Sequence, residues 1–290
     1  MKPPTKLAII GDPVAESLSP AIHSAALSSL GLGLQYEAMR VPVSCLNDFF
    51  AELRARYLGL NVTRPLKEIV IDLCDEVSSE AAQAGSVNTV AFKDGRAYGA
   101  STDVCGFMPA IRTVTSRDFS VAVILGTGGV ARAAALALRR EGARVHVAGR
   151  NELAGRRLAA DLNVSFGSIS APSTHSALER ADLLVNATPL GGGATATESP
   201  LPDDAPLPPQ GAVFDLVYRP RITRLLQRAR DEGCVTIDGL RLLVEQAALS
   251  LQIWTGRQGP RQVMRAAALG ALNERGLEPE PFQAMQGRGI

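Results

Sequence analysis

Apolar and polar residues alternate along the middle of this chain in a way that predicts strands and helices in turn. Residues 121–125 form a short apolar run rich in β-branched side chains, which is typical of a buried strand. Residues 133–140 favour helix, and a second apolar run covers residues 143–148. Strands joined by helical crossovers lie parallel, so the pattern predicts a parallel sheet covered by helices.

The same alternation continues towards the end of the chain. Helices are expected at residues 152–162, 222–232, 240–254 and 260–274, and strands at residues 182–187, 213–217 and 234–237. The proline- and glycine-rich stretch at residues 186–211 predicts a long loop that starts at the carboxyl end of a strand and lies mostly on the surface. A polar tail follows the last expected helix.

The first third of the chain predicts further α/β structure. Strands are expected at residues 7–10, 34–41 and 57–62, helices at residues 21–30, 46–56, 66–73 and 106–113, and a hairpin at residues 87–92 and 96–101. Asp94 and Gly95, between the two hairpin strands, are a strong turn signal. Such a hairpin brings Asn88 and Asp103 to the same outer end of its two strands.

Length and composition restrict the class of protein. Two domains are expected for 290 residues. Apolar residues make up 46% and charged residues 20%, with a net charge of +1, which is typical of a soluble globular protein and favours neither nucleic acid nor an anionic membrane as a partner. No apolar run approaches the roughly 20 residues of a membrane helix, and the first apolar stretch is too short for a signal peptide. We therefore expect a cytoplasmic protein.

The cysteines and histidines indicate no metal centre. Cys45, Cys74, Cys105 and Cys234 are scattered without a C-x-x-C pair, and no histidine lies at metal-ligand spacing from them. In an intracellular chain such cysteines are expected to be reduced and mostly buried.

The apolar run at residues 121–125 ends in a glycine turn with the spacing of a dinucleotide-binding motif. Gly126, Gly128 and Ala131 take the three positions of G-x-G-x-x-G/A. The first glycine allows the tight turn, the second lets the backbone approach a pyrophosphate, and the small third residue lets the helix pack on the strand. The phosphates then meet the positive end of the helix. Alternatively, the glycines end the strand for steric reasons alone.

Arg150 ends the second apolar run, roughly 20 residues after the glycines, where an NAD-binding unit usually has an acidic residue. An arginine cannot accept a hydrogen bond from a ribose 2'-hydroxyl, but its planar guanidinium can bind a 2'-phosphate. The sequence therefore favours NADP, with NAD as the other possibility. In the alternative interpretation, Arg150 is a solvated residue at the end of a strand.

Two segments near the N-terminus carry candidate binding groups. Ser19 stands before a proline at the start of a predicted helix, which suits an N-cap, but capping does not explain Ser17. The two hydroxyls could instead present donors to an anionic oxygen. Lys67 lies in the first turn of the predicted helix 66–73, where a cation opposes the helix dipole. A catalytic role for Lys67 would explain that position. In the alternative interpretation, Lys67 is a surface lysine without a functional role.

Several motifs, in the right order, resemble those of the shikimate dehydrogenase family over about residues 7–256. The matches are S-L-S-P-x-x-H at residues 17–23, N-V-T-x-P-x-K at 61–67, V-N-T at 87–89, T-D at 102–103, N-A-T-P at 186–189, and the last motifs at 215–218, 239–240 and 246. The resemblance implies an α/β substrate-binding domain at residues 1–104 and a Rossmann-type, parallel-sheet NADP-binding domain at residues 105–239. It also implies C-terminal helices, within residues 240–290, that pack back on the first domain.

The resemblance implies an activity as well, namely reversible hydride transfer between NADPH and the ring ketone of 3-dehydroshikimate in chorismate and aromatic amino-acid biosynthesis. Lys67 and Asp103 are implied to act together at the reacting oxygen, where negative charge develops during reduction. The implied substrate-binding residues are Ser17, Ser19, Thr63, Asn88, Tyr218 and Gln246. The implied cofactor-binding residues are Gly126, Thr127, Gly128, Gly129, Val130, Ala131, Arg150, Asn151, Thr188, Leu216 and Gly239.

Some positions depart from the family pattern. Glu16 stands in place of a frequent histidine, Ser24 and Ser101 in place of asparagines, and Gly149-Arg150-Asn151 in place of N-R-T. Glu16 brings a negative charge near the implied carboxylate site, and the changes around Arg150 affect the cofactor site. A dehydrogenase of quinate or of an aminated shikimate is therefore one alternative, and a catalytically silent dinucleotide sensor is another. A small-molecule substrate is the expected partner, and the protein is expected to be a monomer or a homodimer.

Overall fold

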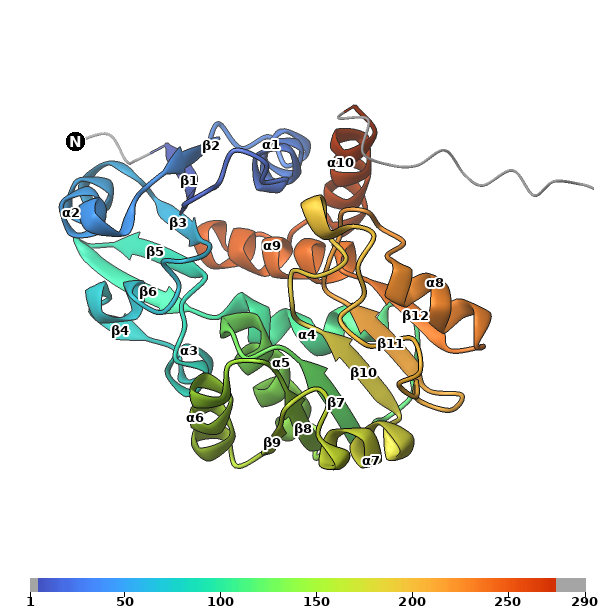
Figure 1. Cartoon of the computed structure of the whole chain (residues 1–290). Coiled ribbons are helices and arrows are strands. Elements are labelled where there is room, and N and C mark those ends of the chain that lie inside the picture. The colour runs from blue at the N-terminus through green and yellow to red at the C-terminus, as the bar shows by residue number, and fades with distance from the viewer. Residues whose placement is uncertain (1–4, 275–290) are drawn as a thin grey trace, which may run out of the picture.

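The computed structural model describes residues 5–274, which form two six-stranded sheets with helices packed against them (Figure 1). The expected polar tail, and with it the end of the expected segment 240–290, lies outside the described residues. Within residues 5–274, no helix combines the length and the apolar character that crossing a bilayer requires.

The first sheet comes from the N-terminal third of the chain and has the strand order β2-β1-β3-β5-β6-β4. Its strands are β1 (Lys6–Gly11), β2 (Gln35–Arg40), β3 (Gly59–Val62), β4 (Glu76–Val77), β5 (Thr89–Lys93) and β6 (Arg96–Ala100). β1 is parallel to β2 and β3, whereas β5 is antiparallel to both β3 and β6. The expected hairpin turn is confirmed, since Asp94 and Gly95 have φ angles of 53° and 74°.

Four helices accompany this sheet, namely α1 (Ser19–Ser29), α2 (Leu46–Arg56), α3 (Ser79–Ala84) and α4 (Thr102–Arg112). α2 has the expected bounds because Leu46, Phe50 and Leu53 recur on one face and are buried there. α1 begins before the expected residue 21, and its N-cap is Leu18 without a side-chain cap. The expectation that Ser19 caps this helix is therefore wrong.

The second sheet has the strand order β12-β11-β10-β7-β8-β9, and all of its pairings are parallel. Its strands are β7 (Val121–Leu125), β8 (Arg144–Ala148), β9 (Ser165–Gly167), β10 (Leu183–Asn186), β11 (Ala212–Asp215) and β12 (Val235–Asp238). Read from β9, the order is 3-2-1-4-5-6, the dinucleotide-binding order of Rossmann folds. From β7 the sheet grows to one side through β8 and β9 and then to the other side through β10, so β7 and β10 flank the point where the strand order switches. Ligands bind at such a point, outside the carboxyl ends of the strands.

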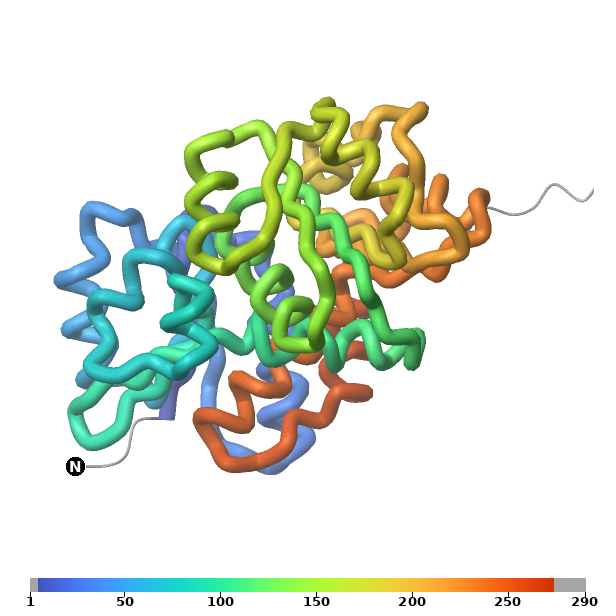
Figure 2. Tube along the Cα trace, turned by 90° about the horizontal axis from the view of Figure 1, so that it is seen from below, coloured from blue at the N-terminus to red at the C-terminus, as the bar shows by residue number. Residues whose placement is uncertain are grey.

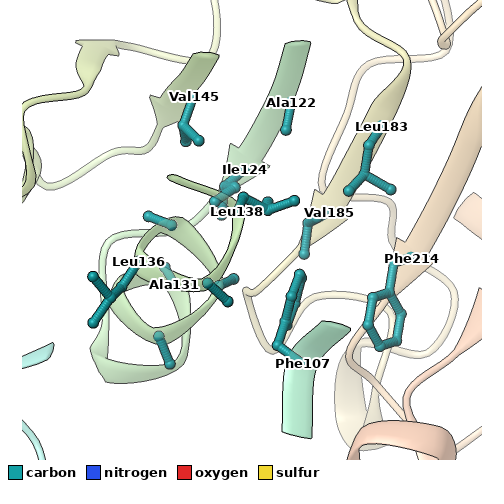
Figure 3. Packing of buried hydrophobic residues seen from close by; sticks show 14 of the residues in the cluster. Phe107, Ala122, Ile124, Ala131, Leu136, Leu138, Val145, Leu183, Val185 and Phe214 are labelled. Atoms are coloured by element: carbon teal, nitrogen blue, oxygen red, sulfur yellow. The ribbon is translucent and has the colours of Figure 1, made fainter. Parts of the chain in front are cut away.

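Helices α5 (Gly129–Arg140), α6 (Glu152–Leu162), α7 (Pro172–Arg180) and α8 (Arg224–Asp231) cover the second sheet. α5 packs closely because the residues it buries are mostly alanine, with Leu136 and Leu138 added. In Figure 3, Ala131 and Leu138 of α5 lie towards Ile124 and Val185, whereas Leu136 points away from these strands. Phe107 of α4 and Phe214 of β11 belong to the same cluster. The two phenylalanine rings lie 5.3 Å apart, so the same core anchors α4, which begins at the first sheet.

The last two helices, α9 (Leu240–Thr255) and α10 (Arg261–Glu274), return to the N-terminal part of the fold. Leu251 of α9 and Met264 of α10 share a buried cluster with Leu27 of α1, and α10 lies beside α1 in Figure 2. α9 also packs along α4, where a Cβ at Gly106 would come within 3.1 Å of the backbone nitrogen of Gln246. This close approach, which glycine allows, carries Gln246 towards the first sheet.

Two further parts of the fold differ from the expectations. The segments 74–84 and 163–181 hold β4, α3, β9 and α7, none of which the hydrophobic pattern predicted, because each is short and buries few apolar side chains. The helix expected at residues 66–73 is wrong. That segment consists of turns that end in a 3₁₀ helix at Val70–Leu73. The carbonyl of Lys67 accepts the backbone N–H of Val87, a residue outside the segment, in place of a helical partner.

Candidate active site

A cavity of about 1600 Å³ lies between the two sheets and is lined by residues from both. All of the substrate, catalytic and cofactor residues expected from the sequence line it except Ala131. Ala131 is completely buried in α5, which agrees with the packing role of the third position of the glycine motif. The fold thus gathers side chains from segments that are more than 200 residues apart.

Lys67 and Asp103 form an ion pair within this cavity. The Nζ of Lys67 donates to the Oδ2 of Asp103 over 2.6 Å, and the two side chains are only 17% and 10% exposed. Leu66 and Val70 are buried in an apolar cluster of the first sheet and hold the turns around Lys67 against it. Asp103 lies in the first turn of α4, three residues earlier than the helix was expected, and a carboxylate is favourable at that end of the helix dipole. The arrangement places one cation and one carboxylate where a proton could be exchanged with a bound oxygen.

A buried network of hydrogen bonds supports Asn88, which precedes β5. Its Oδ1 accepts the backbone N–H of Thr102 at 2.7 Å, and its Nδ2 donates to the hydroxyl of Thr102 at 2.9 Å and to Oε1 of Gln246 at 3.4 Å. Thr102, one residue before Asp103, therefore fixes the amide orientation of Asn88, and Gln246 links Asn88 to α9.

Asn61 is the centre of the same network, although the sequence did not single it out. Its Nδ2 donates to the carbonyl of Asn88 and to the hydroxyls of Thr89 and Ser250, at 3.0–3.2 Å, and its Oδ1 accepts the hydroxyl of Tyr36 at 2.7 Å. Because Asn61 opens the N-V-T motif, the sequence contained a signal that could have marked it as a site residue. No motif or spacing in the sequence marked Ser250, which is a lone serine within a mostly apolar helix.

The two serines near the N-terminus occupy one loop at the start of α1. The hydroxyl oxygen of Ser17 accepts the backbone N–H of Ser19 at 3.2 Å, so Ser17, rather than Ser19, stabilises the entry into the helix. Ser19 is buried, whereas Ser17 and Thr63 are half-buried at the cavity. Both residues of the S-x-S pair line the cavity.

The glycine turn has the shape that a pyrophosphate requires. Gly126 has a φ of 119°, and a Cβ there would meet the carbonyl oxygen of Ala187 at 2.9 Å, so only glycine fits between the ends of β7 and β10. A Cβ at Gly128 would meet nothing within 4 Å, and α5 has no side-chain cap. The first N–H groups of α5 thus face an open part of the cavity, where they can bind a phosphate.

Arg150 follows β8 at the far end of the same cavity. Its side chain is exposed and, among residues 5–274, has no carboxylate or other hydrogen-bonding partner. Asn151 behaves differently, because its Oδ1 accepts the N–H of Ala154 at 3.0 Å and so caps α6. An unpartnered guanidinium beside a phosphate-binding turn fits a second phosphate, and the donor set as a whole fits NADP.

The loops after β10 and β11, which follow the strands next to the glycine turn, are held by a buried carboxylate. Asp215 accepts hydrogen bonds from Asn186, Thr223 and the backbone N–H of Val217, and burial raises its pKa to about 6. Asn186 in turn accepts the N–H of Thr188 at 3.0 Å. These bonds fix the loops after β10 and β11, where Thr188 and Leu216 line the cavity.

Gly239 completes this part of the cavity at the start of α9. A Cβ at this position would lie 2.3 Å from the carbonyl oxygen of Leu216, so glycine is required for the two backbones to touch. The expected cofactor residues Thr188, Leu216 and Gly239 are thereby brought together at the cavity, with Thr188 next to Gly126 of the glycine turn.

Comparison with known proteins identifies the family to which these features belong. A family model of the shikimate dehydrogenase substrate-binding domain matches residues 9–90, and a model of the shikimate 5'-dehydrogenase C-terminal domain matches residues 239–269. The chain is 42% identical over 279 residues to the shikimate dehydrogenase (NADP(+)) of Symbiobacterium thermophilum, and the match covers 92% of this chain and 94% of that protein.

Solved structures of this family have the same fold as this chain. The shikimate 5-dehydrogenase of Thermus thermophilus, crystallised with NADP(H) and shikimate, aligns with a TM-score of 0.85 and 39% identity over 92% of this chain and 99% of that one. A quinate dehydrogenase of Corynebacterium glutamicum in complex with NAD aligns with a TM-score of 0.84 and 31% identity, with 92% and 99% covered. With the two-sheet fold, the glycine turn and the buried Lys67–Asp103 pair in place, these matches show that the chain belongs to the shikimate dehydrogenase family.

Proposed function

We propose that this protein is an NADP-dependent shikimate dehydrogenase, which reversibly reduces 3-dehydroshikimate to shikimate. The observation that carries the proposal is the 2.6 Å contact between Lys67 and Asp103 in a cavity that also contains the glycine turn and Arg150. The names and bound ligands of the related enzymes support the same reaction.

The chemistry of Lys67 and Asp103 suits the reduction of a ketone. When NADPH is bound, it supplies the hydride for the carbonyl carbon. Negative charge then develops on the carbonyl oxygen, where the ammonium of Lys67 stabilises it and donates the proton that completes the hydroxyl group. Asp103 orients the ammonium and balances its charge. In the oxidation direction, the same lysine receives the proton of the hydroxyl group.

The substrate is bound through its carboxylate and its ring hydroxyls. We assign the carboxylate to Ser17, Ser19 and Tyr218, which line the cavity together. We assign the ring hydroxyls to Thr63, Asn88 and Gln246, since a polyol requires neutral donors and acceptors. The hydrogen bonds that hold Asn88 and Gln246 in fixed orientations support this assignment.

The cofactor lies between the glycine turn and the loops after β10 and β11 in this proposal. The backbone of residues 126–130 binds the pyrophosphate, Arg150 binds the 2'-phosphate, and Asn151 positions Arg150 by capping α6. Thr188, Leu216 and Gly239 form the wall on the nicotinamide side. The proposed units are a substrate domain at residues 1–104, a cofactor domain at 105–239 and a C-terminal segment at 240–290. The enzyme is proposed to work in the cytoplasm as a monomer or a homodimer.

A steady-state screen tests the function directly. Shikimate, quinate and an aminated shikimate are each supplied with NADP and with NAD, and the formation of reduced cofactor is followed by its absorbance. We expect the highest kcat/KM for shikimate with NADP. A higher value for quinate with NAD would assign the protein to the alternative activity of this family, and no turnover with any pair would favour a cofactor-binding sensor.

A further inference from the structure

A glutamate side chain lies beside the start of α5, at the turn to which the pyrophosphate is assigned. Glu68 follows Lys67 in the turns after β3, and it lines the cavity together with Gly128 and Gly129. Its Oε1 lies 3.8 Å from the position that a Cβ on Gly129, the first residue of α5, would take. The first half of the molecule thus places a carboxylate at the phosphate-binding turn of the second half.

The charge of Glu68 is not compensated by another side chain. Glu68 is exposed, and within the part of the chain that the structure describes its carboxylate has no hydrogen bond or ion pair. Two other carboxylates line the cavity. Asp103 is paired with Lys67, and Glu16 contacts Arg219. Glu68 therefore adds a negative charge to a cavity whose expected ligands are themselves anions.

The position of Glu68 relative to α5 is set by bonds on both sides. The carbonyl of Lys67, one residue before Glu68, accepts the backbone N–H of Val87 at 2.9 Å. In the first turn of α5, Nε of Arg132 donates to the carbonyl of Ala84 at 2.9 Å. The short segment after α3 thus holds both the backbone before Glu68 and the start of α5. The carboxylate stays near the glycine turn unless the side chain itself rotates away.

A carboxylate and a pyrophosphate compete for the start of α5. The positive end of the helix dipole and the first N–H groups of the helix favour an anion placed there. In the free protein, the carboxylate of Glu68 gains from this field. With a dinucleotide bound, the same carboxylate faces the charge of the pyrophosphate, and the two repel each other. Binding is therefore weaker than the phosphate-binding groups alone would make it.

We propose that Glu68 limits the affinity for the dinucleotide by repelling its pyrophosphate, and thereby favours release of the cofactor. This inference rests on the proposed function, in which residues 126–130 bind the pyrophosphate. It concerns the part that NADP and NAD share, whereas Arg150 is assigned to the 2'-phosphate alone. Release of a product limits turnover in many enzymes, so a weaker hold on the pyrophosphate suits a cofactor that must leave in every cycle.

Calorimetric titration of the protein without substrate tests this repulsion. Glu68→Gln should lower the Kd for NADP and the Kd for NAD by the same factor, roughly threefold to tenfold at low ionic strength. Raising the salt concentration to about 0.5 M should reduce this change, because salt screens exposed charges. Glu68→Lys should lower both Kd values further, since the effect follows the charge of the side chain.

Two controls separate the pyrophosphate from other causes. Adenosine 2'-phosphate, which has a 2'-phosphate but no pyrophosphate, should compete with NADP with the same Kd in the wild type and in both variants. Glu52→Gln removes an exposed carboxylate on α2 that does not line the cavity, so it makes the same change in net charge and should leave the Kd values unchanged. Thermal unfolding of each variant identifies any loss of fold.

Other results contradict the inference in distinct ways. Unchanged affinities in Glu68→Gln would mean that the carboxylate turns away from the cofactor, and weaker binding would mean that it contributes a favourable contact. A change for NADP but not for NAD would place the effect at the 2'-phosphate. The proposed function is tested separately. A wild type that binds neither dinucleotide contradicts both proposals, whereas one that binds NADP without oxidising shikimate contradicts the proposed function alone.

Discussion

The ammonium of Lys67 and the carboxylate of Asp103 lie 2.6 Å apart, although 36 residues separate them in the chain. Lys67 belongs to the turns after β3, and Asp103 to the first turn of α4, so the contact forms only when the first sheet and α4 come together. Because both side chains are mostly buried, each charge depends on the other for compensation. The pair is a product of the tertiary fold.

Replacing Lys67 with alanine should lower kcat by roughly 10²-fold or more, because the reacting oxygen would lose its proton donor. The dissociation constant for NADP should change little, since the phosphate-binding groups lie at the glycine turn and Arg150. Steady-state kinetics and calorimetric titration with NADP measure the two quantities. Lys93→Ala is the matched control, because Lys93 is an exposed lysine at the end of β5 in the same sheet. A kcat that stays at the wild-type value would remove Lys67 from the mechanism.

Replacing Arg150 with alanine should raise the KM for NADP much more than the KM for NAD. The guanidinium has no carboxylate partner within the described residues, so its removal costs little stability and mainly affects a ligand phosphate. The ratio of the two KM values, before and after substitution, is the relevant measurement. Arg157→Ala, at an exposed arginine of α6, should leave that ratio unchanged. Equal effects of Arg150→Ala on both cofactors would make Arg150 an ordinary surface residue.

Gly149 and Thr127 should be coupled in the cofactor site. A Cβ at Gly149 would lie 2.7 Å from Cγ2 of Thr127, which is too close for any side chain unless Thr127 moves. Gly149→Asn alone should therefore weaken NADP binding and lower stability by about 1–3 kcal/mol, the usual cost of overpacking. Adding Thr127→Ala should recover most of both losses, as measured by calorimetry and urea unfolding. A double variant as impaired as Gly149→Asn would show that the contact with Thr127 is not the cause.

Local patterns were sufficient for much of the fold. The expected bounds of α2 and α6 match the structure, because each helix repeats its apolar positions with helical spacing. The glycine turn was equally clear, since the spacing of Gly126, Gly128 and Ala131 marks it in the sequence, and Gly126 has the positive φ that such a turn requires. Such features are encoded within a few neighbouring residues, and a single sequence contains them in full.

Interactions between distant segments were not predictable in the same way. Ser250 meets Asn61 across 189 residues, and Arg219 meets Glu16 across 203, without any local pattern that marks either pair. The segment around Lys67 resembled a helix in its sequence, but in the fold it forms turns, and the carbonyl of Lys67 is bonded to the distant N–H of Val87. Tertiary hydrogen bonds here override a weak local preference.

The buried imidazole of His23 should make the protein less stable as the pH falls. His23 stacks on Tyr36 with ring centroids 4.3 Å apart, near Trp254, and burial lowers its pKa from 6.5 to about 3. Between these two values the unfolded chain binds a proton that the folded chain does not, so this contribution is complete above pH 6.5 and declines below it. From pH 7.5 to 5, the wild type should lose about 2 kcal/mol of unfolding free energy that His23→Phe, which keeps a stacked ring, does not lose. Urea unfolding at both pH values measures the difference, with His175→Phe as a control at an exposed histidine. The same pH dependence in His23→Phe as in the wild type would show that His23 does not cause it.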